Sequence, residues 1–129
     1  MSDEKKQYNK VKIEHGGNGW GGPLIIEPTS EKKYIVSVTG GGIHSVAKKI
    51  SELTGGEAYD GFKSSVPFNQ MACVVIDCGG NSRVGVFPMK NVLTININGG
   101  GPSGPLKQFI KENLFVSGVG LANITLMKK

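Results

Sequence analysis

The stretch Tyr34–Ile50, YIVSVTGGGIHSVAKKI, decides the fold class. Its first five residues are rich in β-branched side chains, which is typical of a buried strand. A glycine triplet follows, and glycine clusters between apolar segments mark tight turns. The apolar residues after the triplet recur at helical spacing on one face. They are Ile43, Val46, Ala47, Ile50 and Leu53. Gly55 and Gly56 end this helix, so the stretch predicts a strand, a tight turn and a helix.

The same order of strand, glycine triplet and helix recurs at Thr94–Ile110, TININGGGPSGPLKQFI. Ser103 is a suitable helix cap, and Pro105 falls in the first helical turn. The apolar stripe of this second helix is Leu106, Phe109, Ile110 and Leu114. Two such units indicate an α/β sandwich, in which helices pack on a mixed β-sheet. With 129 residues, the chain suits a single domain of this class.

The remaining strands are predicted from short apolar or alternating runs. They are Val11–Glu14, Pro23–Glu27, Met71–Ile76, Val84–Phe87, Leu93–Ile97 and Ile124–Met127. Met71–Ile76 is short, continuous and apolar, which favours a central place in the sheet. Val84–Phe87 is expected to pair with it as a hairpin. Glu57–Gln70 contains turn residues, and no regular element is predicted there.

Charge and composition exclude several classes of function. The net charge is +5, and much of the lysine lies at the two ends of the chain. Solvated termini explain this, and the alternative is attraction to an acidic protein partner or a membrane surface. Nucleic-acid binding is disfavoured, because the sequence has no basic helix, zinc spacing or aromatic-basic pattern. No signal peptide or membrane-length apolar run occurs, which predicts a cytoplasmic protein without direct membrane insertion. We expect residues 1–10 to form a flexible tail and residues 11–129 to form the domain.

Two cysteines, Cys73 and Cys78, are the candidates for thiol chemistry. Residues five apart on one strand point to opposite faces, so a disulfide between them is not expected. His15 and His44 have no ligand spacing with these cysteines, so no metal or other cofactor is expected. Cys73 lies inside an apolar run and is predicted to be a core residue. Cys78 follows that run and is the candidate nucleophile.

The loop of the predicted hairpin has the composition of an anion site. Its residues are Cys78, Gly79, Gly80, Asn81, Ser82 and Arg83. The two glycines let successive backbone N–H groups converge into an anion-binding concavity, and the asparagine and serine add side-chain donors. The arginine adds a positive charge whose geometry matches phosphate oxygens. A thiol in these surroundings tends toward the thiolate, which is the nucleophilic form. The loop can therefore hold a doubly charged group on the sulfur, and the alternative is a small, inert residue at a hairpin tip.

Three further features of the sequence each allow two interpretations. Asp77 disfavours a thiolate at Cys78, unless it faces away along the strand or helps to expel a phosphoryl group by repulsion. The glycine-rich turn around Trp20, the only tryptophan, either fills core space or forms part of a partner surface. The two glycine triplets match neither a dinucleotide fingerprint nor a P-loop, so tight turns are favoured over phosphate binding. Gly99–Gly104 could still bind a phosphate or a partner.

Five short motifs occur in order along the chain. They are GGNGWGGPL (Gly16–Leu24), DGFK (Asp60–Lys63), VIDCGG (Val75–Gly80), GPSGPL (Gly101–Leu106) and VSGV (Val116–Val119). Together they resemble the IIB domain of the glucitol/sorbitol-specific phosphotransferase system. The resemblance extends from about Val11 to Met127. The tryptophan turn and the IDCGG turn, at this separation, are its most specific part.

This resemblance implies a phosphotransferase that works as a phosphoryl carrier. Cys78 would accept the phosphoryl group from a phosphohistidine of a glucitol-type IIA protein. It would pass the group to glucitol, sorbitol or a related polyol bound to the IIC membrane component. Arg83 and the amides of Gly79 to Ser82 would stabilise the phosphoryl group and its transition state, without a metal or nucleotide. The carrier would work in the cytoplasm, at the inner face of the cell membrane, through the IIC component.

One departure from the family pattern leaves the setting open. Domains of this family usually continue into a membrane-embedded portion, whereas this sequence ends at Lys129. An excised domain, a separate subunit and a relative with a changed role are all compatible with that end. Two rival functions remain. One is a non-enzymatic module that binds a small anion or a protein partner through its glycine-rich turns, and the other is a phosphorylated regulatory relative.

Overall fold

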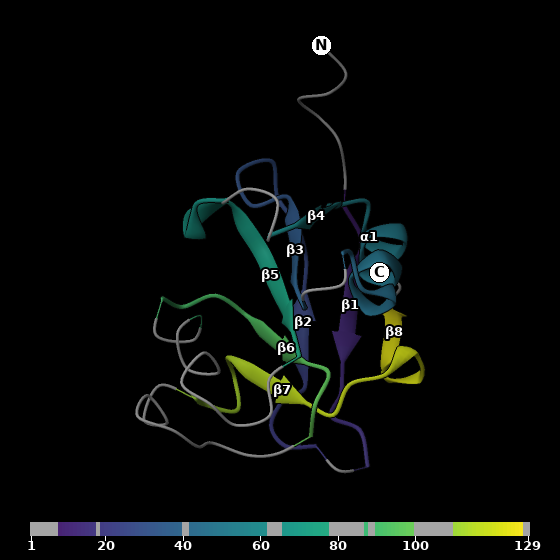
Figure 1. Cartoon of the computed structure of the whole chain (residues 1–129). Coiled ribbons are helices and arrows are strands. Elements are labelled where there is room, and N and C mark those ends of the chain that lie inside the picture. Colours follow the sequence, from purple (N-terminus) through teal and green to yellow (C-terminus); the bar gives the residue numbers. More distant parts are fainter. Residues whose placement is uncertain are drawn as a thin grey trace.

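The described part of the chain consists of eight strands, one α-helix and two short 3-10 helices (Figure 1). The computed structural model describes residues 8–17, 19–39, 42–61, 66–77, 87, 90–99 and 110–127. The strands are β1 (Lys10–Ile13), β2 (Leu24–Ile26), β3 (Tyr34–Val38), β4 (Glu57–Asp60), β5 (Met71–Ile76), β6 (Thr94–Asn96), β7 (Phe115–Ser117) and β8 (Ile124–Met127). The helices are α1 (Ser45–Thr54), η2 (Phe68–Gln70) and η5 (Leu121–Asn123). No helix among these residues is both long and apolar enough to cross a membrane.

Five parallel strands form the larger sheet, in the order β4-β3-β5-β6-β7. β5 lies at its centre, hydrogen-bonded to β3 on one side and to β6 on the other. Side chains alternate along β5, so that Cys73 and Val75 join one apolar cluster while Val74 and Ile76 join another. The strand is therefore buried on both faces, which explains its uninterrupted apolar run.

Three antiparallel strands form the smaller sheet, in the order β2-β1-β8. One face of this sheet is buried through Val11, Ile13, Leu24, Ile26 and Ile124. The same apolar cluster contains the inner face of α1 and reaches one face of the parallel sheet. In Figure 1, α1 lies beside β1 and β8. The helix and the two sheets thus share one core.

α1 begins and ends at residues that satisfy its terminal backbone groups. His44 is the N-cap, and its Nδ1 accepts a hydrogen bond from the N–H of Val46 at 3.0 Å. Gly55 caps the other end with φ of 89°, and its N–H donates to the carbonyl of Ser51 at 2.8 Å. α1 is the crossover between the parallel strands β3 and β4, so the predicted strand–turn–helix unit opens a βαβ unit.

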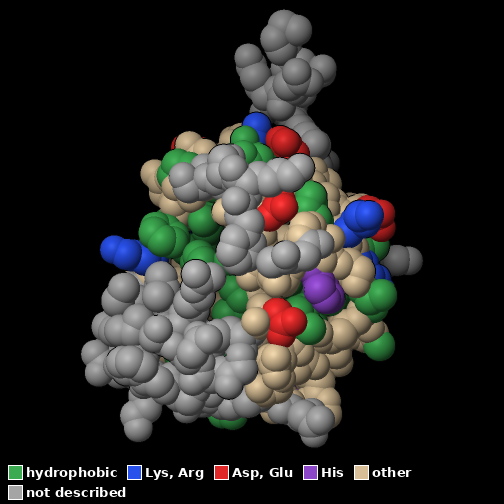
Figure 2. Space-filling view, viewed as in Figure 1, with side chains coloured by type: hydrophobic (Ala, Val, Ile, Leu, Met, Phe, Trp, Pro, Cys, Tyr) green, Lys and Arg blue, Asp and Glu red, His purple; other side chains and the backbone are tan. Residues whose placement is uncertain are grey.

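The second apolar cluster lies on the other face of the parallel sheet. It includes Val36, Val74, Ile76 and Phe115. An apolar hollow of about 440 Å³ borders it, and Phe68 of η2 forms part of the wall. Figure 2 shows hydrophobic side chains at the surface over η2 and the amino end of β5. Both faces of the sheet are therefore apolar, as a parallel sheet requires.

The predicted α/β class is confirmed, and most predicted elements lie where the sequence places them. β3, β5 and β8 coincide with their predicted ranges, and the central position of β5 is confirmed. β1, β2 and β6 differ from prediction by one residue at each end. The predicted helix after the first glycine triplet is α1, and Gly55 ends it as expected.

Three expectations about strand pairing are wrong. Between Val74 and Ile76, β5 is occupied on both sides by parallel neighbours, so it has no edge for an antiparallel hairpin with Val84–Phe87. Glu57–Asp60, expected to be irregular, forms the edge strand β4 against β3. The parallel and antiparallel strands expected in one mixed sheet divide between two sheets.

The chain before β7 also differs from prediction. Most of the predicted second helix lies outside the described residues, as does its cap Ser103. Its expected end, from Lys111 to Leu114, forms a turn, in which the N–H of Leu114 donates to the carbonyl of Lys111 at 3.0 Å. This turn leads directly into β7, a strand that the sequence pattern did not predict.

Candidate functional site

The carboxyl ends of β3 and β5 lie where the chain reverses its direction across the parallel sheet. From β3 the chain passes to β4 on one side, and it returns past β3 to β5, β6 and β7 on the other. Ligands of open parallel sheets bind outside the carboxyl ends of the strands at such a switch point. Val38 and Ile76 are register partners there. Asp77, the first residue after β5, is exposed at this edge.

The six predicted site residues lie outside the described residues. They are Cys78, Gly79, Gly80, Asn81, Ser82 and Arg83. The sequence segment that they form begins directly after Asp77. The described residues that border the switch point are Thr39 after β3, Asp77 after β5 and Asn98 after β6.

Asp77 is held by a residue from the loop after the neighbouring strand. The Nδ2 of Asn98 donates a hydrogen bond to the Oδ1 of Asp77 at 2.8 Å. The backbone of Asn98 is itself fixed twice. Its N–H donates to the Oδ1 of Asn96 at 3.1 Å, and its carbonyl accepts from the N–H of Gly118 at 2.9 Å. The carboxylate of Asp77 is thus oriented sideways, toward the loop after β6.

The loop after β3 is built by hydroxyl groups and a glycine. The buried Oγ of Ser37 donates to the carbonyl of Gly42 at 3.3 Å and accepts from the N–H of His44 at 3.0 Å. The Oγ1 of Thr39 also donates to the Gly42 carbonyl, at 3.4 Å. Gly42 has φ of 85°, which side-chain-bearing residues rarely adopt. The end of the first glycine triplet therefore forms the tight strand-to-helix turn that was predicted. It brings the N-terminus of α1, whose dipole favours anions, to the same end of the sheet.

Cys73 is a core residue, as predicted. Its side chain is fully buried in the cluster shared by α1 and the two sheets, and it forms no disulfide. Burial raises the pKa of the Cys73 thiol far above its ordinary value. Because the thiolate is the reactive form, Cys73 is chemically inert in the folded protein.

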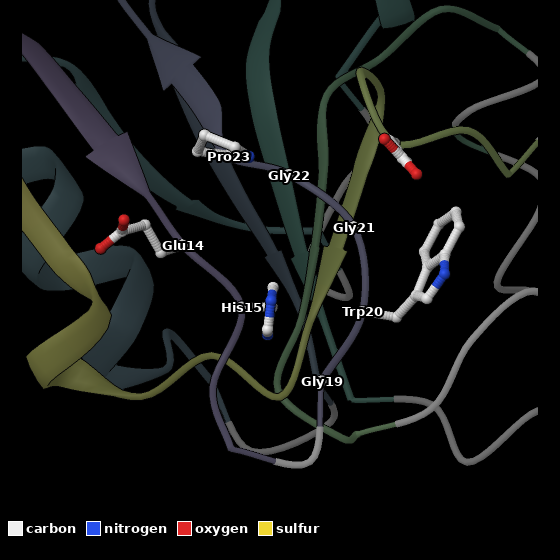
Figure 3. A pocket seen from close by; sticks show the side chains of 8 residues that line it. Glu14, His15, Gly19, Trp20, Gly21, Gly22 and Pro23 are labelled. Carbon is white, nitrogen blue, oxygen red and sulfur yellow. The ribbon is translucent and has the colours of Figure 1, made fainter.

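The glycine-rich segment around Trp20 runs along β7 at the edge of the parallel sheet (Figure 3). Trp20 forms two hydrogen bonds with Ser117, both at 2.9 Å. The N–H of Trp20 donates to the Oγ of Ser117, and the N–H of Ser117 donates to the carbonyl of Trp20. A Cβ added to Gly19 would lie 1.8 Å from the carbonyl oxygen of Ser117. This close approach requires glycine. The segment thus covers part of the outer edge of β7, much as a further strand would.

The Trp20 side chain is half-buried and has a structural role. Its ring packs on Phe115, with the ring centroids 6.3 Å apart, at the border of the second apolar cluster. A hollow of about 520 Å³ lies beside it, bordered by His15 and Glu112. In Figure 3, the side chain of Glu14 points away from Trp20, on the other side of His15. The contact with Phe115 therefore supports a core-filling role for Trp20. The Trp20 ring also lines the hollow and is accessible from it.

Asn98 is the residue of this edge that sequence reasoning missed. The signal for it is its position just after the predicted strand Leu93–Ile97, because a polar residue that follows a parallel strand lies at the ligand-binding edge. That signal depends on knowing that β5 and β6 are neighbours with parallel direction. The expected hairpin gave β5 a different neighbour, so Asn98 was not connected to Asp77.

The family comparison matches almost the whole chain. The family model described as "Sorbitol phosphotransferase enzyme II N-terminus" matches residues 10–129. The match therefore includes β1 to β8 and the segment with the six predicted site residues.

A curated relative gives a consistent result. The chain is 47% identical over 122 residues to a protein of Clostridium beijerinckii named "PTS system glucitol/sorbitol-specific EIIB component". The aligned region covers 94% of this chain and 36% of that protein. The chain thus spans about a third of the length of this relative. No solved structure matches the chain.

Proposed function

Because the chain belongs to the family of sorbitol phosphotransferase enzyme II N-terminal domains, we propose that it is a phosphoryl carrier of a sugar phosphotransferase system. Cys78 accepts the phosphoryl group from a phosphohistidine of a glucitol-type IIA protein. It then passes the group to glucitol, sorbitol or a related polyol bound to a IIC membrane component. The carrier works at the cytoplasmic face of that membrane. The observation that carries this proposal is the family match over residues 10–129, which includes the IDCGG motif.

Each step exchanges one bond to phosphorus for another. In the first step, the Cys78 thiolate attacks phosphorus, and an S–P bond forms while the N–P bond of the donor histidine breaks. The leaving imidazole nitrogen keeps the electron pair. In the second step, a polyol hydroxyl attacks, an O–P bond forms, and the S–P bond breaks to restore the thiolate. The hydroxyl proton passes to a base of the acceptor complex or to water.

Charge stabilisation is assigned to the residues that follow the thiol. The amides of Gly79 and Gly80, with Asn81 and Ser82, donate to the phosphoryl oxygens, and the Arg83 guanidinium offsets their charge. This assignment rests on the composition of the segment and on the family resemblance. The described fold supports it, because the segment begins at the carboxyl end of the central strand, at the switch point of the parallel sheet. The N-terminus of α1 at that end also favours a negative group.

The buried state of Cys73 supports the choice of Cys78. These two residues are the only cysteines of the chain. Cys73 has no exposed surface, and its raised thiol pKa keeps it protonated. A donor protein cannot bring a phosphohistidine to a side chain inside the core.

The test is intact-protein mass spectrometry after incubation with phosphoenolpyruvate, the general phosphotransferase proteins and a glucitol-type IIA protein. We expect one acid-labile phosphoryl gain in the natural chain and in Cys73→Ala, and none in Cys78→Ser. A gain that persists in Cys78→Ser would move the site to another residue. No gain in the natural chain, with a IIA protein that phosphorylates a known glucitol-type carrier, would contradict the carrier function.

A further inference from the structure

The hydrogen bond between Asn98 and Asp77 joins the end of β5 to the loop after the neighbouring strand β6. Asp77 is the residue directly before Cys78 in the sequence. One of its carboxylate oxygens, Oδ1, accepts from the Nδ2 of Asn98 at 2.8 Å. Both side chains are exposed, and the distance is that of a charge-assisted hydrogen bond. The Asp77 carboxylate is therefore held toward the loop after β6.

Asn98 is well suited to hold another residue, because its own position is fixed by three strands. Its N–H donates to the Oδ1 of Asn96, the last residue of β6, which is buried. Its carbonyl accepts from the N–H of Gly118, directly after β7. The preceding residue, Ile97, donates its N–H to the carbonyl of Ile76 at the end of β5, at 2.8 Å. The amide of Asn98 thus extends from a rigid support.

A carboxylate beside a thiol acts on both states of the proposed carrier. It disfavours the thiolate, because two negative charges repel each other. It also disfavours the phosphorylated thiol, which carries more negative charge than the thiolate, and so favours onward transfer of the phosphoryl group. An amide donor on the carboxylate offsets part of its charge and turns it toward the loop after β6. The strength of both effects therefore depends on the hydrogen bond from Asn98.

We propose that Asn98 is a positioning residue, which acts through Asp77 to set the reactivity of Cys78. It holds the carboxylate toward the loop after β6 and offsets part of its charge, so that the carboxylate disfavours the Cys78 thiolate less than a carboxylate without this donor would. This inference rests on the proposed function for its phosphoryl part. Its thiol part does not, because thiol ionisation is measurable without any donor protein.

Few other described titratable groups lie at this end of the parallel sheet. Asp60 ends β4, two strands away from β5. His44 lies before α1, and its Nδ1 is engaged in the N-cap. Arg83 follows Cys78 in the sequence and lies outside the described residues. Asp77 is thus the described carboxylate at the end of β5 itself.

The test measures the alkylation rate of Cys78 by iodoacetamide against pH, with peptide mass spectrometry to separate Cys78 from Cys73. The variants are Asn98→Ala, Asp77→Asn and the double variant, with Asn113→Ala as a control at an exposed asparagine away from Asp77. We expect Asn98→Ala to slow alkylation at pH 7 about threefold and to move the pH midpoint upward by about half a unit. Asp77→Asn is expected to shift both quantities the other way.

The double variant decides whether Asn98 acts through Asp77. We expect it to match Asp77→Asn in rate and midpoint, because the amide then has no carboxylate to hold. An equal effect of Asn98→Ala in both backgrounds, or no effect in either, would overturn the inference. Urea unfolding of each variant detects a general loss of fold, and a merely structural role would not move the pH midpoint.

A second readout tests the phosphoryl part. In the phosphorylated protein, Asp77→Asn is expected to lengthen the lifetime of the S–P bond at least twofold, and the double variant is expected to match it. If Cys78 is never phosphorylated but the alkylation result holds, the proposed function fails and the positioning role stands. If Cys78 is phosphorylated and the double variant differs from Asp77→Asn, the positioning role fails alone.

Discussion

The contact between the glycine-rich segment and β7 leads to a sharp prediction for Gly19→Ala. The added Cβ would lie 1.8 Å from the carbonyl oxygen of Ser117, a separation that requires the two backbones to move apart by at least about 1 Å. Three hydrogen bonds join Ser117 to this segment, one to Gly16 at 3.3 Å and two to Trp20 at 2.9 Å. At about 1 kcal/mol each, their loss should lower the free energy of unfolding by about 2–4 kcal/mol.

Gly17 offers a matched control two residues away. A Cβ at Gly17 meets no atom within 4 Å, and the residue is exposed. Gly17→Ala should therefore leave stability unchanged, or raise it by about 0.5 kcal/mol through the unfolded state. The assay is urea unfolding followed by the fluorescence of Trp20, the only tryptophan, and by circular dichroism.

Two outcomes of this comparison would refute the structural role of the glycine-rich segment. If Gly19→Ala unfolds at the same urea concentration as Gly17→Ala, the close contact with β7 does not stabilise the fold. If Gly19→Ala changes only the fluorescence of Trp20 while the free energy of unfolding is kept, the segment moves without cost. Either result would contradict the view that this segment is an integral cover of β7.

Three further predictions concern the thiols, the helix cap and the arginine. Burial raises the pKa of the Cys73 thiol, so above about pH 9.0 the unfolded chain releases the thiol proton before the folded one does. The free energy of unfolding should then fall by up to about 1.4 kcal/mol per pH unit. In urea titrations between about pH 8 and 10.5, Cys73→Ala should not show this part of the fall in unfolding free energy. His44→Ala should lower the free energy of unfolding in urea by about 1 kcal/mol because the N-cap of α1 is lost. His44→Asn should keep most of this stabilisation, because asparagine also caps helices. Equal losses in the two variants would refute the capping role of His44. Arg83→Ala should slow phosphoryl transfer to Cys78 at least about tenfold with unchanged unfolding, as followed by quench-flow mass spectrometry, and an unchanged rate would refute its role.

The strands that the sequence predicts well are those whose pattern is local. β3 and β5 are apolar runs bounded by polar or glycine residues, and their burial on both faces follows from the composition of each run alone. α1 is equally local, because its apolar spacing and its terminal glycine lie within one stretch. These elements could be placed without knowing their neighbours.

The strands that sequence reasoning missed depend on their neighbours. β4 has the sequence EAYD, which has no apolar run, and it exists because α1 returns the chain to the free edge of β3. β7 is only three residues long. It is a strand because it pairs with β6 on one side and contacts the glycine-rich segment on the other. Pairing of this kind is decided by tertiary structure, so single-sequence patterns carry little information about it.

The two cysteines show how far the site could be predicted. Both belong to one stretch, MACVVIDC, and the roles proposed for them are separated by the strand boundary at Ile76. Before that boundary, Cys73 is enclosed by two sheets and a helix, and its thiol is inert. Beyond it, the chain reaches the carboxyl edge of the sheet, where ligands can enter. That much required only the position of one strand.

The electrostatic setting of the second cysteine could not be predicted in the same way. We propose that it depends on the hydrogen bond from Asn98 to Asp77, which joins residues 21 positions apart that follow the neighbouring parallel strands β6 and β5. A hairpin would have placed Val84–Phe87 beside β5 and left Asp77 without this donor. The parallel sheet instead places the amide of Asn98, in the loop after β6, within hydrogen-bond distance of the Asp77 carboxylate. On this view the topology that sequence reasoning missed is also what lets a thiol function beside an aspartate, and the comparison of Asn98→Ala in the natural and Asp77→Asn backgrounds tests that link directly.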